Sequence, residues 1–405
     1  MHNPLDWITT ELSQLQAENL RRVRRTVQPL AGGWCEVDGR RLRNFAGNDY
    51  LGLAGDPRLA EAARQALDSA GTGARASALV CGRTEWHERL EARLAAFEGA
   101  EAALLFPTGY AANVGAIAAL VGDSDLVISD RLNHASLIDG CRLSGARVRV
   151  YPHADAAALD RELAKHRDVR RKLIVTDGVF SMDGDLAPLG ELEQIAQRHD
   201  AMLLVDEAHG TGVFGDHGRG ACEVFHVKHS VIRVGTLSKA LGSQGGFVVG
   251  PQSLIDWLWN KSRPQVFSTA LSPASCAAAA AALDVIEAEP QRRAILQQRS
   301  DELRVALRSL GIEPLAASRG PIVPVVLGDA GQTMRVAQSL SDQGFLVGAI
   351  RPPTVPRNSS RLRISVCSLH SFDDVAALAA AVALALQGTS GVARPDQRDG
   401  RGVRE

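Results

Sequence analysis

A lysine in a glycine-rich loop is the first residue of this sequence that could do covalent chemistry. Lys239 lies in the run GTLSKALG (235–242), directly after an apolar run at 231–234. If that run is a strand, Lys239 lies at its carboxyl end, where open α/β sheets bind their ligands. The small neighbours would let a planar group approach the backbone. A buried lysine can form an imine or act as a base, whereas the alternative is a surface lysine in a flexible turn.

A carboxylate and an imidazole follow a second apolar run, in the sequence VDEAHG (205–210). A buried Asp206 there could pair with a pyridinium nitrogen and keep it protonated, which makes the ring an electron sink. Ala208 would leave room for a flat ring, and His209 would reach its phenolic oxygen. The alternatives are a helix N-cap or a metal carboxylate. We expect no metal, because the sequence has no HExxH and no second histidine cluster.

Three further turns place polar groups after apolar runs. In FPTGYAAN the backbone N–H groups of Gly109 and Tyr110 would face a phosphate at a helix start. His134, in NHAS, could stack on a ring or donate a proton, and Ser181 follows the run LIVTD. Each signal alone is weak, since a lone histidine is more often structural. Together they predict, in chain order along one sheet edge, a phosphate cradle, a stacking group, a ring-nitrogen partner and an imine lysine.

Such turns require a mostly parallel sheet covered by helices. Helical patterns alternate with apolar runs, as in Trp86, Leu90, Leu94 and Phe97, which share one helix face. Several runs are continuous, which is typical of strands buried on both faces. We therefore predict an α/β fold with a large domain at 56–290 and a mostly parallel seven-stranded sheet, with strands at 102–106, 126–129, 148–151, 173–176, 202–205, 231–234 and 247–249.

The segments before and after the predicted sheet have other sequence patterns. Residues 1–55 predict a helical arm (1–30) and a hairpin (34–45) that turns at Asp38-Gly39. Two long helices, at 272–289 and 292–310, lead into the order strand, helix, strand, strand, helix over 321–388. We expect a smaller C-terminal α/β domain at 291–388. Residues 389–405 lack apolar content and are expected to be disordered.

The bulk composition of the 405 residues excludes several function classes. The net charge is −1 and 22% of residues are charged, with no sustained basic stripe beyond a short arginine cluster at 21–25. We therefore expect no nucleic-acid partner. We expect no signal peptide, because the first residues lack a cationic segment followed by an apolar run, and the most apolar stretch, 276–283, is too short to span a membrane. The six cysteines form no CxxC pair, which favours reduced thiols in a cytoplasmic protein.

The motifs together resemble the α-oxoamine synthases, a family of fold-type I pyridoxal-phosphate (PLP) enzymes. The resemblance covers about residues 20 to 388 and implies PLP as the cofactor, and condensation of an amino acid with an acyl thioester with loss of CO2. It rests on NDYLGL (48–53), FPTGYAAN (106–113), NHAS (133–136), DGVFSMDGD (177–185), VDEAHGTGVFGDHGRG (205–220), GTLSKALGSQGG (235–246), FSTALSP (267–273), RPPTVP (351–356) and RLRIS (361–365).

The resemblance also implies a role for each matching residue. Lys239, His134 and Asp206 would be catalytic, as imine lysine and base, stacking group, and pyridinium partner. The cofactor would also contact Gly109, Tyr110, Ser181, His209, Thr236, and, from the neighbouring subunit of a homodimer, Ser268 and Thr269. The substrates would contact Arg21, Asn48, His134, Thr354 and Arg363, the last as a bidentate partner of a carboxylate.

The segment Arg351-Pro352-Pro353 favours one branch of the family. It resembles the biotin-pathway branch, which joins L-alanine to a pimeloyl thioester, on coenzyme A or an acyl carrier protein, to give 8-amino-7-oxononanoate. The alternatives are a sister branch that uses glycine (5-aminolevulinate synthases, aminoketobutyrate ligases) and a cofactor-free binding protein. The chain departs from the family at 73–82, where Ala78-Leu79 replaces a common Gly-His pair on the acyl-chain side. His87 is expected to cap or pack a helix.

Overall fold

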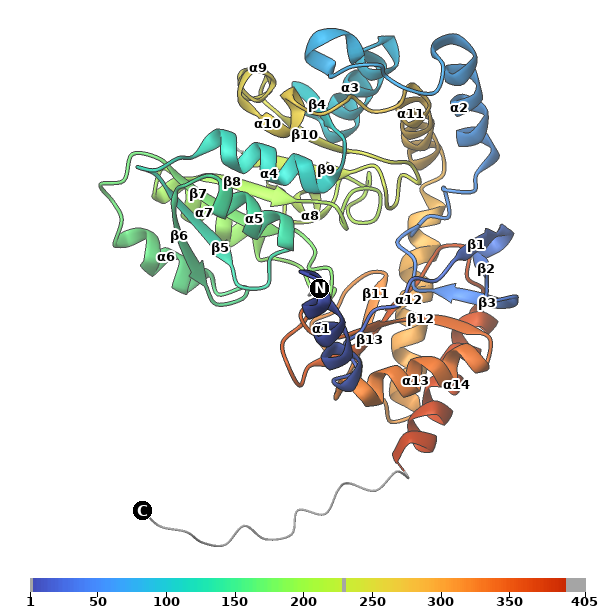
Figure 1. Ribbon diagram of the computed structural model, residues 1–405. Coiled ribbons are helices and arrows are strands. Elements are labelled where there is room, and N and C mark those ends of the chain that lie inside the picture. The colour runs from blue at the N-terminus through green and yellow to red at the C-terminus, as the bar shows by residue number, and fades with distance from the viewer. Residues whose placement is uncertain (1–2, 228–230, 391–405) are drawn as a thin grey trace, which may run out of the picture.

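The computed structural model of the chain describes residues 3–227 and 231–390 (Figure 1). Its larger sheet has seven strands in the order β4-β10-β9-β8-β7-β5-β6. The strands from β9 to β6 pair in parallel, and only β10 runs antiparallel to its two neighbours. All seven predicted strands are confirmed: β4 (Ala102–Phe106), β5 (Leu126–Asp130), β6 (Arg147–Tyr151), β7 (Lys172–Asp177), β8 (Met202–Asp206), β9 (Val231–Thr236) and β10 (Gly246–Gly250).

Helices cover both faces of this sheet, which explains its continuous apolar runs. On β7, Leu173 and Val175 pack into one core and Ile174 into the other. One face is covered by α4 (Gly109–Leu120), α5 (Ala135–Leu143) and α9 (Gln252–Lys261). The other is covered by α6 (Ala156–Ala164), α7 (Leu189–Arg198) and α8 (Ala221–Val224), with α3 (Glu85–Glu98) packing beside β4 and β10.

The second sheet combines strands from the two ends of the chain. Its order is β1-β2-β3-β12-β13-β11, and β3 pairs in parallel with β12, placing Arg43 opposite Phe345. The helices α12 (Gln291–Ser309), α13 (Ala330–Asp342) and α14 (Phe372–Ser390) supply its core. The strands are β1 (Val27–Leu30), β2 (Trp34–Val37), β3 (Arg40–Phe45), β11 (Ile322–Gly328), β12 (Phe345–Ile350) and β13 (Ser360–Ser365).

The hairpin at 34–45 is confirmed. Asp38 (φ 52°) and Gly39 (φ 75°) both adopt the left-handed conformation that two-residue hairpin turns require. The helical arm is shorter than expected, since α1 spans Asp6–Ala17 and the expectation of helix at 27–30 is wrong. Those residues form β1 because they pair with β2 and extend the hairpin.

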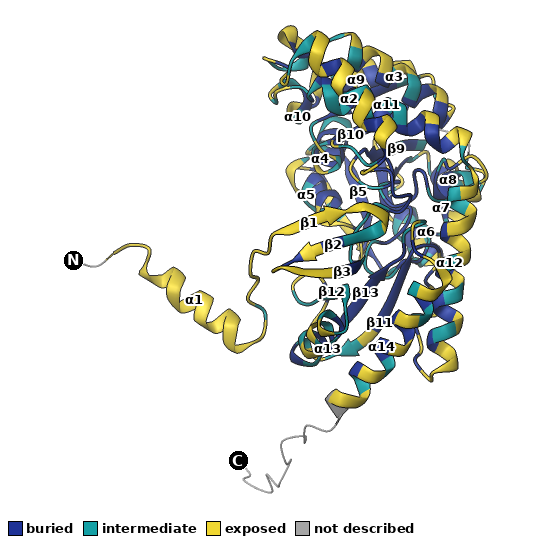
Figure 2. Cartoon of the chain, turned by 90° about the vertical axis from the view of Figure 1, so that its right-hand side faces the viewer, coloured by how far each residue is buried: buried dark blue, intermediate teal, exposed yellow. Residues whose placement is uncertain are grey.

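The N-terminal helix α1 projects from the body of the molecule, and none of its residues is buried (Figure 2). The division into domains at 55/56 and 290/291 stays a prediction. The strands β1 to β3 lie in the same sheet as the strands of residues 322–365. Helix α14 extends to Ser390, and residues 391–405 of the predicted tail lie outside the described residues. Within residues 3–227 and 231–390, no helix is long and apolar enough to cross a membrane.

The remaining helices connect the elements near the site. Two long helices were predicted after residue 272, and α11 (Pro273–Ala288) and α12 confirm them. Helix α11 packs against α2 (Pro57–Ala70) and α3, and the short α10 (Arg263–Val266) precedes it. In Figure 1, α12 runs from the region of α11 down to the second sheet. The chain therefore crosses between the two sheets at two places, near residue 50 and at the α11–α12 junction.

Candidate active site

The carboxyl ends of β7, β8 and β9 bring three predicted site residues, Asp206, His209 and Lys239, to one edge together with Asp177. Asp177 and Asp206 end neighbouring strands and lie opposite each other in register. Beyond β8 and β9, Lys239 Nζ lies 2.9 Å from His209 Nε2. Burial lowers the pKa of Lys239 to about 8, although the carboxylates of Asp206 and Asp177 oppose that shift. About a tenth of this amine is therefore neutral, and nucleophilic, at pH 7.

A buried row of polar groups leads from Lys239 to Arg363. The Tyr50 hydroxyl lies 2.6 Å from His209 Nδ1 and accepts a hydrogen bond of 3.2 Å from Arg363. The Asn48 side-chain oxygen accepts from Tyr50 and from Arg363, each at 3.2 Å. The row therefore brings together the predicted Lys239, His209, Asn48 and Arg363. Sequence reasoning missed Tyr50, although the motif NDYLGL contains it.

Asp206 is held so that its carboxylate has a fixed orientation. Its two oxygens accept from the Ala208 backbone N–H (2.8 Å) and from the Asn113 amide (2.6 Å). Asn113 also donates to Ser136 (2.9 Å). Neither Asn113 nor Ser136 was predicted, although both lie inside the motifs FPTGYAAN and NHAS. The side chain of Asp206 is buried, so an unpaired charge there would be costly without a cationic partner.

The two histidines of the site are held as neutral rings. Burial, reinforced by Lys239, lowers the pKa of His209 well below its ordinary value. Burial also lowers the pKa of His134. His134 is fixed by its backbone N–H, which donates to Asp177 (2.7 Å), and by its ring Nδ1, which lies 2.7 Å from Ser136 Oγ. The pKa of Asp177 is raised well above its ordinary value by burial and then by the charge of Asp206.

The turn predicted to hold a phosphate lies at the start of α4. Thr108 caps the helix by accepting from the Ala111 N–H, and the N–H groups of the first turn have no acceptor within the helix. A Cβ on Gly109 would lie 3.2 Å from Thr236 Cβ, so the turn and the end of β9 are in close contact. The phenol of Tyr110 points elsewhere and donates to Asp139. Its backbone N–H is thus the group that suits a phosphate.

Ser181 meets the site through its backbone. Its carbonyl accepts a hydrogen bond of 2.6 Å from Arg363 Nε, and Arg363 also donates to Ser365 (2.7 Å). Arg363 is buried. Its contacts on three sides fix the guanidinium plane, which favours a planar, bidentate partner such as a carboxylate.

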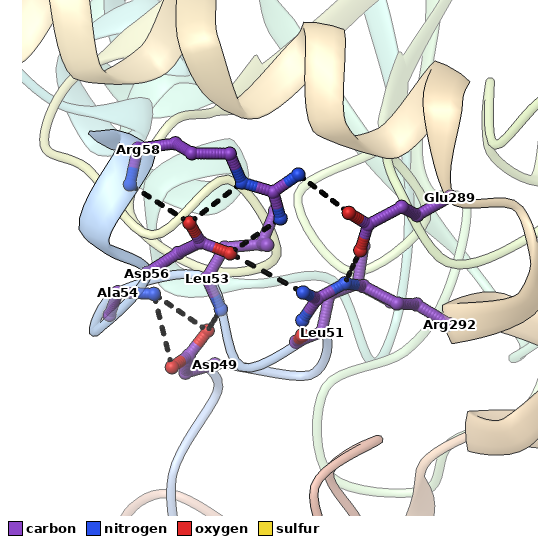
Figure 3. Close-up of polar contacts among 8 residues, drawn as sticks. All are labelled: Asp49, Leu51, Leu53, Ala54, Asp56, Arg58, Glu289 and Arg292. Carbon is purple, nitrogen blue, oxygen red and sulfur yellow. Dashed lines mark hydrogen bonds and ion pairs between the residues drawn. The ribbon is translucent and has the colours of Figure 1, made fainter. Parts of the chain in front are cut away.

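An ion-pair network holds the segment that carries Asn48 and Tyr50 (Figure 3). Arg292, at the start of α12, donates to the Leu51 carbonyl (3.0 Å), and the Asp49 carboxylate accepts from the Leu53 N–H (2.8 Å). The charged members of the network are Asp56, Arg58, Glu289 and Arg292. The crossing between the two sheets near residue 50 is therefore tied to the crossing at the α11–α12 junction.

Four predicted contacts lie apart from Lys239 in the described chain. Thr269 pairs with Ser77 in an isolated bridge, and Ser268 and Thr269 line a small cavity together with Ala78 and His87. Arg21 is exposed after α1. The hydroxyl of Thr354 accepts from Arg22 (3.2 Å) rather than from any residue of the buried row.

His87 caps α3, as predicted. Its Nδ1 accepts from the Thr84 N–H (3.1 Å), which completes a capping box, and its Nε2 lies 3.0 Å from the Leu271 carbonyl. The atypical segment nearby forms a single π-helical turn, Ala78–Gly82. Leu79 is half-exposed there. In the described residues, no group of histidines, cysteines and carboxylates has the arrangement of a metal site.

Comparison with known proteins identifies the class that this fold and site define. The family model "Aminotransferase class I and II" matches residues 40–382. Serine palmitoyltransferase from S. paucimobilis, solved with a bound PLP–myriocin aldimine, superposes with a TM-score of 0.91 at 30% identity, covering 96% of this chain and 100% of that one. The fold is therefore that of the fold-type I PLP enzymes, as predicted, and PLP is the cofactor.

Relatives of similar sequence identify the branch of PLP enzymes to which the chain belongs. The 8-amino-7-oxononanoate synthase of Anaeromyxobacter dehalogenans (strain 2CP-1 / ATCC BAA-258) is 49% identical over 94% of this chain and 96% of its own. 8-Amino-7-oxononanoate synthase 2 of Bacillus subtilis (strain 168) is 44% identical over 91% and 94%. The chain belongs to the 8-amino-7-oxononanoate synthases. The predicted family and branch are confirmed, and a cofactor-free binding protein is not supported.

Proposed function

We propose that this chain catalyses the decarboxylative condensation of L-alanine with a pimeloyl thioester, releasing 8-amino-7-oxononanoate, CO2 and the free thiol. The names of its relatives support this reaction. The observation that carries the proposal is the buried row from Lys239 through His209 and Tyr50 to Arg363. It places a base and a carboxylate-binding guanidinium at the two ends of one site, as an amino-acid substrate requires.

The residues around Lys239 fit PLP. A primary amine with a lowered pKa suits the aldehyde, a fixed and buried carboxylate suits the ring nitrogen, and the cradle at Gly109 and Thr236 suits the phosphate. Bound there, PLP supplies an electron sink for negative charge at the substrate's Cα. Asp206 would hold the proton on the ring nitrogen, His209 would donate to or accept from the ring oxygen, and His134 would stack on the ring face.

Arg363 would bind and orient the carboxylate of alanine. Its guanidinium is fixed by the Ser181 carbonyl and by Asn48. With the carboxylate held, the Cα–H bond of alanine can face Lys239. The Lys239 amine would accept that proton, since its pKa of about 8 leaves it partly neutral. His134, held by Ser136, would support the thioester carbonyl oxygen as the new carbon–carbon bond forms.

We also propose that the enzyme works as a homodimer in the cytoplasm. Ser268 and Thr269 belong to the motif FSTALSP and do not contact the Lys239 row within the described chain. In a dimer they would reach the partner subunit's phosphate cradle. A solution mass of twice the 43.1 kDa chain would support this arrangement. Mixing a Lys239→Ala chain with a Thr269→Ala chain would then restore one complete site in each heterodimer, whereas a monomer would show no such rescue.

One assay tests the reaction directly. The purified protein, loaded with PLP, is incubated with L-alanine and pimeloyl-CoA, and free thiol and 8-amino-7-oxononanoate are measured, with Lys239→Ala as the inactive control. Glycine and serine, and succinyl-CoA and acetyl-CoA, are tested in parallel. A clear preference for glycine with succinyl-CoA or acetyl-CoA would assign the chain to a sister branch. Replacing coenzyme A by an acyl carrier protein identifies the carrier.

A further inference from the structure

His153 lies outside the site but between two of the loops that contribute to it. It follows β6, and its ring is clamped by two carboxylates: Nδ1 lies 3.0 Å from Asp130, which ends β5, and Nε2 lies 2.8 Å from Asp185, in the loop after β7. The edge of the ring also packs on Phe180 of that loop, with ring centroids 4.4 Å apart. One side chain therefore links two loops that follow different strands.

The clamp requires the imidazolium form of His153. A neutral imidazole has one N–H and can donate to only one of two ionised carboxylates, whereas the imidazolium has two. Burial alone would lower the pKa of His153, but the hydrogen bonds to Asp130 and Asp185 outweigh it and raise the pKa to about 9. The two contacts and the raised pKa thus favour the protonated ring of His153 at neutral pH. The other oxygen of Asp185 is buried and has no hydrogen-bond partner in the described residues, so His153 is the group that compensates this carboxylate.

The first carboxylate fixes the turn before His134. Asp130 accepts from the backbone N–H groups of Leu132 and Ala154, each at 2.8 Å, and its carbonyl accepts from the Asn133 N–H. The turn therefore delivers His134 to the edge of the sheet. Rotation of the Asp130 carboxylate would release both N–H groups and shift the start of α5.

The second carboxylate fixes the loop that carries Ser181. The Asp185 carbonyl accepts from the Phe180 N–H (2.9 Å), and the Phe180 carbonyl accepts from the Gly184 N–H (2.8 Å), so residues 180–185 form a closed turn. The Ser181 carbonyl on that turn receives the hydrogen bond of Arg363. The orientation of Arg363 therefore depends on a loop that Asp185 anchors.

We propose that His153 is a positioning residue for the proposed reaction: by bridging Asp130 and Asp185 it holds the His134 turn and the Ser181 loop in one fixed relation. Its side chain contacts Asp130, Asp185 and Phe180 rather than the row from Lys239 to Arg363. It acts on the acyl side through His134 and on the amino-acid side through Ser181 and Arg363. The inference rests on the proposed function for its kinetic consequences, while the coupling of the two loops can be measured without any substrate.

The test uses the PLP-loaded protein and two variants. His153→Phe keeps a ring against Phe180 but removes both donors, and should lower kcat/KM for alanine by about 10- to 100-fold, since small misplacements of reacting groups cost this much. Asp185→Asn removes only the charge on the Ser181 side. It should raise the KM for alanine several-fold with little change in kcat, whereas His153→Phe should change both. This split is not expected from a general loss of stability.

Amide hydrogen exchange supplies the second readout. His153→Phe should exchange faster than the unaltered protein in both segments, 130–134 and 178–186. The matched control is His199→Phe, because His199 also pairs with an aspartate, Asp160, at 2.8 Å but between α6 and α7, away from the site. His199→Phe should leave exchange in both segments and the KM for alanine unchanged.

Three results decide the matter. Unchanged exchange in either segment of His153→Phe would overturn the coupling. Normal kcat and KM in His153→Phe, with the unaltered protein active on alanine, would overturn the positioning role. An unaltered protein with no activity on alanine would count against the proposed function alone, since the exchange experiment would still decide whether His153 couples the loops. Should His153→Phe fail to fold, Asp185→Asn decides by the same KM and exchange criteria in segment 178–186.

Discussion

The amine of Lys239 lies 2.9 Å from the ring of His209. Burial is the largest influence on the pKa of the amine, and the nearby carboxylates of Asp206 and Asp177 act against it. In the apoprotein the rate of PLP capture should rise about tenfold per pH unit up to about pH 8 and then level off, because only the neutral amine attacks an aldehyde. The rate is measured by stopped-flow absorbance on adding PLP. Borohydride reduction and peptide mass analysis check that Lys239 is the modified residue. A pH-independent rate between 6 and 8 would contradict the lowered pKa.

Arg363 should be sensitive even to a conservative change. Arg363→Lys keeps the positive charge but cannot bind a carboxylate with two parallel N–H groups or keep the contacts to Ser181 and Asn48. Loss of a charge-assisted hydrogen bond costs about 1.5–3 kcal/mol, so the KM for alanine should rise by roughly 10- to 150-fold. Steady-state kinetics with varied alanine measure this. The control is Arg93→Lys, an arginine paired with Asp284 and Glu287 on the surface; an equal rise there would argue against a specific role.

At the level of single residues, the sequence predicted which residues come together in the site, but it did not predict which residues hold them in place. Lys239, His209 and Arg363 were predicted because each is tied to a strand end or a motif, and the structure joins them. Tyr50 and His153 were missed. Their hydrogen-bond partners lie far away along the chain. The local sequence around a tyrosine or histidine in a loop does not predict hydrogen bonds to distant residues. The catalytic and binding roles assigned to these residues stay predictions.

Helix α3 begins with a capping box whose second member is His87. His87→Ala should lower the free energy of unfolding by about 1–3 kcal/mol, because the Thr84 N–H and the buried Leu271 carbonyl both lose a partner. Thermal unfolding of the PLP-loaded protein measures this, and kcat should not change. His217→Ala, at an exposed histidine paired with Glu223, is the control. A fall in kcat without a fall in melting temperature would instead indicate a role for His87 in the reaction.

Among the helices and strands, too, those set by the local sequence were predictable, whereas pairings between distant segments were not. The strands of the larger sheet were predictable because apolar runs buried on both faces are continuous, and the 38–39 turn because both residues tolerate positive φ. The strand β1 and the parallel pairing of β3 with β12 were not predictable. Pairing between residues 40–45 and 345–350 leaves no trace in the periodicity of either segment.

Across the whole molecule, an ion pair links the two sheets. Arg361, on β13, pairs with Asp183 of the loop after β7, and both side chains are largely buried. Asp183→Asn would leave the arginine charge without a partner, which should cost about 3 kcal/mol and lower the melting temperature. The double variant Arg361→Met/Asp183→Leu should recover most of that loss, because it removes both charges. A melting temperature unchanged in Asp183→Asn would mean that solvent screens the pair.

The parallel pairing of β3 with β12 has a consequence for the synthesis of the polypeptide chain. Residues 40–45 are made long before residues 345–350, so β3 has no partner strand on its β12 side until residue 350 has been made. Asn48 and Tyr50 follow directly on β3, and their partner Arg363 arrives later still. A chain that ends just before residue 363 therefore contains all strands of the seven-stranded sheet but lacks the guanidinium that is proposed to bind the amino-acid carboxylate. The sequence order therefore postpones completion of the proposed carboxylate site until residue 363 has been made.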